Sequence, residues 1–424
     1  MRSSEQVFGN YLQPAGQASF GVHKLLLTAL AAGLMGVLSS SAMFAPSSPP
    51  FFRLPAAAAI IAVIFILTGF RVGKFSTWRL LSLVFWIGYA LTSLISALIH
   101  RDTLLPEVWQ FAGVPLILFM SFPRSAKRYG NVMVLSAIIL AFAPYVLYSL
   151  VRYPIFTPYS GVFLNSNMFG MVVSTISAAL FALLRGALNS RRSSVINMAW
   201  QMTLIVGLAC SLILIFLSGS RTSFITFILM GMIFAGSLFF NVSRNRCMIA
   251  LTVTAVISVT LYILGSAAMN ITSTGFVDTL VNKFLNKLAQ GDTTGGRLYI
   301  WKLVLSNIQL MGMGNGIFFE QPAHNTYIMI LATKGPIAVA FMVAVHLITL
   351  VLAVRRVFYD IRSDGYAIGP LLVVINYLVM GFAENVFGTL GNGINISFLL
   401  MAGVLFNEGQ YLHREHRQQE MQAG

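Results

Sequence analysis

The sequence predicts an all-α integral membrane protein, and three observations carry this prediction. Of the 424 residues, 57% are hydrophobic and only 9% are charged, whereas soluble domains carry about 25% charged residues. The mean hydropathy is +0.80. Several apolar runs reach the length of about 20 residues that crosses a bilayer as a helix. The net charge of +15 is therefore better explained by membrane topology than by nucleic-acid binding.

The apolar runs, read in order, give about twelve spans that form one transmembrane domain over residues 1–424. The predicted spans are 25–45, 54–70, 77–99, 107–122, 130–151, 167–185, 197–217, 222–240, 248–269, 336–354, 367–387 and 393–410. The first run ends in small residues, as a signal peptide does, but we interpret it as the first span. No internal repeat is recognisable.

The distribution of basic residues predicts the orientation. With the N-terminus inside, every short loop on the cytoplasmic side is basic, while most loops on the other side carry one cation or none. The positive-inside rule then places both termini in the cytoplasm. Residues 270–334 become one long extracytoplasmic loop between the ninth and tenth spans. In a bacterium this arrangement corresponds to a multi-pass protein of the inner membrane with its loop in the periplasm.

The long loop contains two short helical patterns. Apolar residues recur every four positions over 276–288, with charged and amide residues opposite, which predicts an amphipathic helix at the interface or on the bundle. Gly291–Gly296 breaks this helix, and Arg297 opens a second helical pattern. Gly312, Gly314 and Gly316 predict a turn that returns the chain to the bundle.

Two arginines on the predicted outer side are candidates for binding an anion. Arg221 follows Ser218-Gly219-Ser220 at the junction of two spans, and Arg297 follows Gly295-Gly296. An Arg at membrane depth costs about 2.5–3.5 kcal/mol, so such residues usually serve a function. The guanidinium fork matches phosphate oxygens. The alternatives are an interfacial Arg221 that reaches the lipid headgroups and an Arg297 that is an ordinary surface residue.

His324, in Ala323-His324-Asn325, is the candidate base. Of the six histidines it alone follows the loop and precedes an apolar helix, and histidine can accept a proton near neutral pH. A purely structural role is the alternative. The outer acidic residues predict neither a metal site nor a glycosidase pair; they are Asp102, Glu107, Asp278, Asp292, Glu320 and a borderline Glu384. We therefore expect no metal and no cofactor.

Taken together, these segments resemble the O-antigen ligase family, which shares its core with O-antigen polymerases and bacterial O-oligosaccharyltransferases. The resemblance covers roughly residues 160–390. It rests on a G-x-F-x-N-x-N element from Gly161 to Asn167, on Ser-Gly-Ser before Arg221, on Gly-Gly-Arg297 with Trp301, and on His324-Asn325. It implies a GT-C-like membrane glycosyltransferase.

The resemblance also implies roles for individual residues. An undecaprenyl diphosphate would carry the glycan, and a sugar hydroxyl of lipid A–core would accept it with inversion, without a metal. Arg221 and Arg297 would hold the diphosphate, and His324 would deprotonate the acceptor. Weaker candidates are Asn325, Asn167, Arg152 and Ser220. A polymerase using the same donor and a transporter of lipid-linked glycans remain alternatives. Membrane lipids are expected around the protein, and nucleic acid is not an expected partner.

Overall fold

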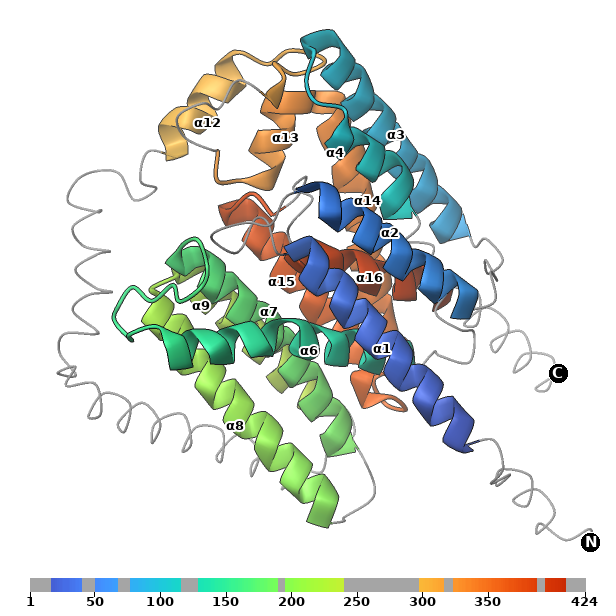
Figure 1. Ribbon diagram of the computed structural model, residues 1–424, viewed down its shortest axis with the longest axis vertical. Helices are drawn as coiled ribbons and strands as arrows, with labels where there is room; N and C mark the ends of the chain where they lie inside the picture. The colour runs from blue at the N-terminus through green and yellow to red at the C-terminus, as the bar shows by residue number, and fades with distance from the viewer. Residues whose placement is uncertain are drawn as a thin grey trace, which may run out of the picture.

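The computed structural model describes residues 17–39, 50–67, 77–115, 129–189, 195–239, 297–315, 323–386 and 393–408, which form helices joined by loops (Figure 1). The helices are α1 (Gln17–Ser39), α2 (Pro50–Leu67), α3 (Thr77–His100), α4 (Leu105–Val108), the π-helical turn η3 (Trp109–Gly113), α6 (Tyr129–Arg152), α7 (Ser166–Asn189), α8 (Val195–Ser218), α9 (Arg221–Leu238), α12 (Arg297–Ser306), α13 (Thr326–Lys334), α14 (Pro336–Asp360), the 3-10 turn η6 (Gly365–Ile368), α15 (Gly369–Ala383) and α16 (Gly393–Glu408).

The predicted all-helical architecture is confirmed in the described residues, and the apolar helices there are consistent with a membrane protein. Seven helices there are long and apolar enough to cross a membrane, and three shorter apolar segments accompany them, at Leu25–Val37, Pro55–Leu67 and Gly393–Phe406. Only the first half of the predicted span 107–122 is described. The predicted span 248–269 and the amphipathic helix over 276–288 lie outside the described residues. The count of twelve spans therefore stays a prediction.

Helix α7 forms the centre of the bundle. Every residue from Phe169 to Leu188 is buried, and α7 contacts α6, α8, α9 and α15. Many of its residues are small, and small residues let membrane helices approach closely. Ser174 Oγ donates to Asn376 Oδ1 of α15 at 2.7 Å, and the Asn376 amide donates to Thr175 Oγ1 at 3.0 Å. These bonds satisfy polar groups that would be costly to bury alone.

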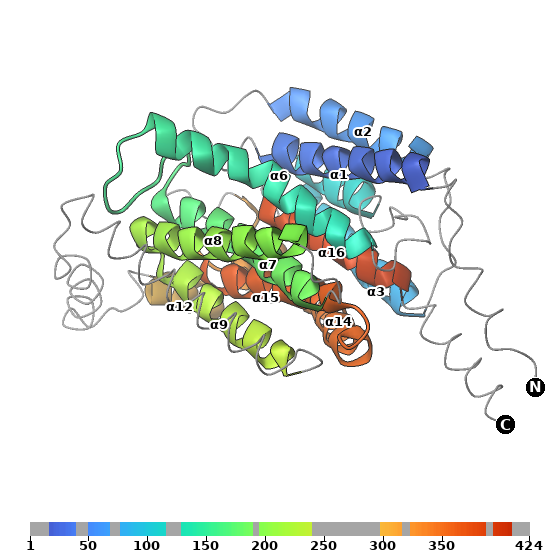
Figure 2. The ribbon, with the colours of Figure 1, turned by 90° about the horizontal axis from the view of Figure 1, so that it is seen from below.

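Two groups of helices cover this centre. Helix α1 lies beside α2 and α6 in both ribbon views, while α8 and α9 lie along α7 on another side (Figures 1 and 2). Helix α3 packs against α14 and touches α13. Helices α12 and α13 lie together at one end of the molecule, beside an end of α3 (Figure 1).

The end of the predicted outer loop is more deeply embedded than we expected. Helix α13 packs against α3, α14 and α15, and its last residue, Lys334, is buried. Lys334 Nζ lies 2.7 Å from Glu107 Oε1 of α4, and the Ser93 hydroxyl donates to Glu107 Oε2 at 2.5 Å. The predicted loop ended at Lys334, yet this lysine is buried, and its carboxylate partner makes that burial possible.

The glycines after α12 make this close packing possible. Gly312 and Gly314 have φ of +69° and +77°, a region that Gly adopts without strain. The amide of Met313 donates to the Ala332 carbonyl at 2.7 Å, and that of Gly314 to the Thr333 carbonyl at 3.2 Å. The described part of the predicted glycine turn thus returns the chain against the last turn of α13.

Candidate functional site

The carboxylate of Glu384 is the hub of a polar cluster at one end of the bundle. Glu384 follows the last residue of α15, and its side chain is only 13% exposed. Three side chains from distant segments reach it. His324 Nδ1 lies 2.7 Å from Oε2, Arg297 Nη2 lies 2.9 Å from Oε1, and the Asn167 amide donates to Oε1 at 3.1 Å. The fold therefore joins Asn167, Arg297 and His324 through one acid.

His324 is held in position by its own backbone and by its neighbours. It has φ of +48°, in the left-handed region that His tolerates better than most residues. Asn325 caps α13, with Oδ1 accepting the amides of Tyr327 and Ile328 at 2.9 and 3.0 Å. The Trp301 indole donates to the Ala323 carbonyl at 2.8 Å. The imidazole is thus presented from a fixed turn at the start of a helix.

The segment that carries Glu384 is fastened to the same turn. The Asn325 amide donates to the Phe382 carbonyl at 2.9 Å. Thr326 Oγ1 donates to the Glu384 carbonyl and accepts the Val386 amide, both at 3.1 Å. These contacts leave His324 and Glu384 little freedom to separate. A catalytic pair would need such support, because catalysis depends on geometry to within about 0.5 Å.

The hydrogen bond to Glu384 defines how His324 can act. An ionised carboxylate only accepts hydrogen bonds, so the proton of the neutral imidazole is on Nδ1 and Nε2 keeps its lone pair. The His324 side chain is 37% exposed, and Nε2 makes no hydrogen bond to the described residues. The pair therefore has the arrangement of a general base oriented by an acid.

Arg297 is more constrained than its predicted role required. Nη1 donates to the Ala383 carbonyl at 2.8 Å while Nη2 binds Glu384, and the side chain is 25% exposed. Two of its five N–H donors are therefore directed to two groups at the end of α15, and the other three make no hydrogen bond to the described residues. Arg297 both orients Glu384 and offsets its negative charge.

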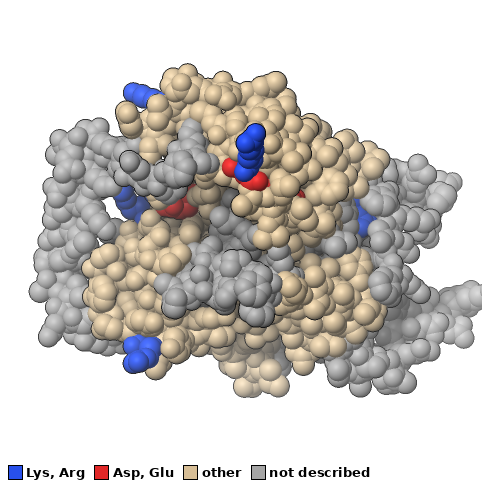
Figure 3. Space-filling view, turned by 45° about the horizontal axis from the view of Figure 1, so that its top comes forward, with Lys and Arg blue, Asp and Glu red and all other residues tan. Residues whose placement is uncertain are grey.

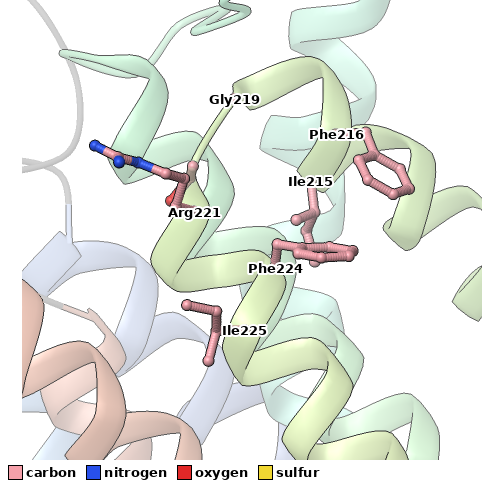
Figure 4. Close-up of a pocket in the computed structure, with 7 residues that line it drawn as sticks. Ile215, Phe216, Gly219, Arg221, Phe224 and Ile225 are labelled. Carbon is pink, nitrogen blue, oxygen red and sulfur yellow. The ribbon is translucent and has the colours of Figure 1, made fainter. Parts of the chain in front are cut away.

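Arg221 presents the opposite case. It is the first residue of α9, which packs against α7 and α15, the helices next to Asn167 and Glu384. Its side chain is partly exposed and makes no hydrogen bond or ion pair with the described residues. In Figure 4 it extends away from the apolar side chains beside it. The turn before Arg221 packs against the first turns of α7, since a Cβ on Gly170 would lie 2.7 Å from Ser220 Cβ, so Arg221 lies at the same end of α7 as Asn167.

The weaker candidates take other positions. Ser220 is buried as the N-cap of α9, where its hydroxyl bonds Ser223 Oγ at 2.8 Å, so we assign it to the helix cap instead of a ligand. The Asn325 side chain likewise makes its hydrogen bonds within the protein, to the first turn of α13 and to the Phe382 carbonyl. Arg152 is exposed at the end of α6 and makes no hydrogen bond or ion pair within the described part of the chain.

The sequence pattern did not indicate Glu384 as the hub of the site and predicted only a borderline outer acid at this position. A signal was available: Glu384 ends an apolar run, and an ionisable residue at membrane depth indicates function. Among the described residues on the face shown in Figure 3, charged side chains are sparse and stand in small separate groups.

A second histidine lies behind the site. His346 of α14 is buried, and its Nδ1 lies 2.9 Å from the Tyr327 hydroxyl. Burial raises the pKa of Tyr327 to about 12, so its hydroxyl keeps its proton at neutral pH. Within the described residues no group of three or more His, Cys, Asp or Glu side chains comes together as metal ligands.

Comparison with models of known protein families finds no match, and comparison with curated protein sequences finds no significant match.

Proposed function

We propose that the chain is a membrane glycosyltransferase of the O-antigen ligase type. It transfers a glycan from undecaprenyl diphosphate to a sugar hydroxyl of lipid A–core, without a metal and with inversion. The observation that carries the proposal is the His324–Glu384 pair, whose nitrogen and oxygen lie 2.7 Å apart, next to the guanidinium of Arg297. When an acceptor hydroxyl attacks a lipid-diphosphate donor, the reaction requires a base for the hydroxyl proton and cations for the leaving diphosphate. His324 and the two arginines are groups of these kinds.

In this reaction His324 receives the proton of the acceptor. The acceptor oxygen forms a bond to the anomeric carbon of the donor sugar as its O–H proton passes to His324 Nε2. The bond between that carbon and the phosphate oxygen breaks, and undecaprenyl diphosphate leaves with the electron pair. Glu384 stabilises the imidazolium that forms, because its carboxylate already accepts from Nδ1.

The departing diphosphate gains negative charge, and the two arginines offset it. The Arg221 side chain, without a partner among the described residues, supplies a full positive charge. Arg297 contributes its remaining donors while it holds Glu384 in place. We expect Arg221 to dominate donor binding and Arg297 to contribute to both binding and orientation. This division refines the equal roles that the sequence predicts.

The arrangement of the helices supports one location for these groups. Helices α7 and α9 begin, and α15 ends, at the same end of the bundle as His324. With both termini in the cytoplasm, as the basic loops predict, this end faces the periplasm of the bacterial inner membrane. No ATP or nucleotide sugar is available there, so a donor activated in advance, such as a lipid diphosphate, is required.

Incubation of the purified protein with glycan-linked undecaprenyl diphosphate tests the proposal. With lipid A–core present, we expect glycan on the core and release of undecaprenyl diphosphate. Elongation of the donor-linked glycan without core would instead show a polymerase using the same groups. Movement of intact donor across proteoliposomes, with no new glycosidic bond, would show a transporter and refute the proposal.

A further inference from the structure

A hollow lies between the last turn of α8 and the first turn of α9. Its volume is about 190 Å³, and it is lined by Ile215, Phe216, Gly219, Arg221, Phe224 and Ile225, together with one serine (Figure 4). The site described above uses only one of these residues, Arg221. The remaining lining is apolar, and no step of the proposed reaction requires it.

The local sequence explains why the hollow stays open. The Phe216 and Phe224 rings lie 5.0 Å apart at an angle of 36° and form one wall. Gly219, with φ of +65°, makes the tight turn and has no side chain to fill the space. The turn is supported from behind, because a Cβ on Gly170 of α7 would lie 2.7 Å from Ser218 Oγ.

The serine hydroxyls of this turn bond within it. Ser218 Oγ donates to the Ile215 carbonyl at 2.6 Å, and the Ser220 amide donates to Ser218 Oγ at 3.1 Å. Ser220 Oγ and Ser223 Oγ share a hydrogen bond at 2.8 Å. Since these hydroxyls are occupied, the hollow offers apolar contact to a ligand, and the polar recognition comes from Arg221.

The position of the hollow indicates a lipid ligand. It lies at the ends of two helices that are long and apolar enough to cross a membrane, and Ile225 at its edge is 60% exposed. On one side, lipid chains can enter from the bilayer. On the other side, the Arg221 guanidinium points away from the apolar wall (Figure 4). A ligand that contacts both the hollow and Arg221 would therefore consist of an apolar chain joined to an anionic group.

The volume limits how much of the chain can enter. A dry cavity of about 150 Å³ binds one benzene molecule, so a hollow of about 190 Å³ accommodates one branched five-carbon group and not a long chain. We propose that the hollow holds the isoprene unit next to the phosphate of a polyprenyl diphosphate, with its anion at Arg221. The proposal rests on the proposed function for the identity of the donor and adds a site that fixes the donor's lipid.

A binding experiment tests the proposal without requiring transfer. The purified protein in nanodiscs is irradiated with a polyprenyl diphosphate that carries a diazirine on its first isoprene unit, and labelled peptides are identified by mass spectrometry. We expect label between residues 215 and 225. Ile225→Trp fills the hollow and should weaken labelling roughly three- to tenfold; the effect is modest because bilayer lipid is as apolar as the hollow.

The matched control is Ile228→Trp. Ile228 lies one turn further along α9, is 44% exposed and does not line the hollow, so labelling should be unchanged. Inorganic pyrophosphate should compete equally well in wild type and Ile225→Trp, and less well in Arg221→Gln. The proposal would be overturned if both Trp variants lost labelling equally, or if label appeared outside the α8–α9 turn. It would also be overturned if phosphatidylglycerol displaced the polyprenyl probe as well as pyrophosphate does. Labelling as expected without any glycan transfer would refute the proposed function and leave this site standing.

Discussion

The Nδ1 atom of His324 lies 2.7 Å from Oε2 of Glu384, although 60 positions separate the two residues in the chain. The contact is made between the turn before α13 and the end of α15. The contact gives His324, otherwise a lone histidine, the geometry of an imidazole oriented by a carboxylate.

Glu384→Gln should remove most activity while the protein still folds. A glutamine amide can donate to His324 and favour the tautomer with its proton on Nε2, which cannot accept the acceptor proton. Loss of the equivalent acid from a serine protease lowers kcat about 10⁴-fold, and we expect a loss of about 10²–10⁴-fold here. Steady-state transfer rates measure it. Asp102→Asn, in an exposed loop outside the cluster, serves as control and should keep its rate.

His324→Ala should leave folding intact and abolish transfer. His324→Asn gives a sharper test, because Asn tolerates the positive φ of this position and its side chain is not a base at neutral pH. Both variants should elute as wild type in size-exclusion chromatography and still bind donor. A transfer rate in His324→Asn within twofold of wild type would show that another group is the base.

Arg221 and Arg297 should respond differently to substitution. Arg221→Gln should raise the donor KM with little change in thermal stability, since no hydrogen bond or ion pair to the described residues is lost. Arg297→Gln should lower kcat as well, because it removes the guanidinium that binds Glu384. Arg297→Lys should rescue poorly, since one ammonium cannot reproduce the two directed bonds to Glu384 and Ala383. A change confined to the acceptor KM in Arg221→Gln would contradict its assignment to the donor.

The buried ion pair between Lys334 and Glu107 should stabilise the position of α13. Removing one partner, as in Lys334→Met, leaves a buried charge unpaired and should cost about 3–5 kcal/mol. The double variant with Glu107→Leu should recover most of that loss, because both charges are gone. Thermal unfolding in detergent compares the three proteins. A double variant no more stable than Lys334→Met would show that the pair's contribution is not one of charge.

Two glycines offer a matched test of packing beside the site. A Cβ at Gly170 of α7 would lie 2.7 Å from Ser218 Oγ and from Ser220 Cβ, whereas one at Gly236 of α9 meets nothing within 4 Å. Gly170→Ala should destabilise the protein by about 1–3 kcal/mol. Gly236→Ala should be neutral or stabilising by up to about 1 kcal/mol. Both are read as shifts in the unfolding midpoint; equal shifts would contradict the close approach at Gly170.

The sequence by itself determined the fold class and most helix positions. Apolar runs report membrane spans because a chain in lipid must satisfy its backbone internally, and predicted spans such as 130–151 and 197–217 lie within α6 and α8 at Tyr129–Arg152 and Val195–Ser218. It also singled out Arg221, Arg297 and His324, because charged or basic groups beside apolar segments are rare and costly.

Only the tertiary structure decided what those groups touch. Four separate segments contribute to the site, with Asn167, Arg297, His324 and Glu384. The role of the Glu384 carboxylate depends on which hydrogen-bond donors lie within about 3 Å of it. The spacing of residues in the sequence does not predict such distances between distant helices. The burial of Lys334 has the same origin, since its partner Glu107 lies 227 positions away. The sequence thus indicates where charge is costly, and the packing of the helices decides which groups compensate for that cost.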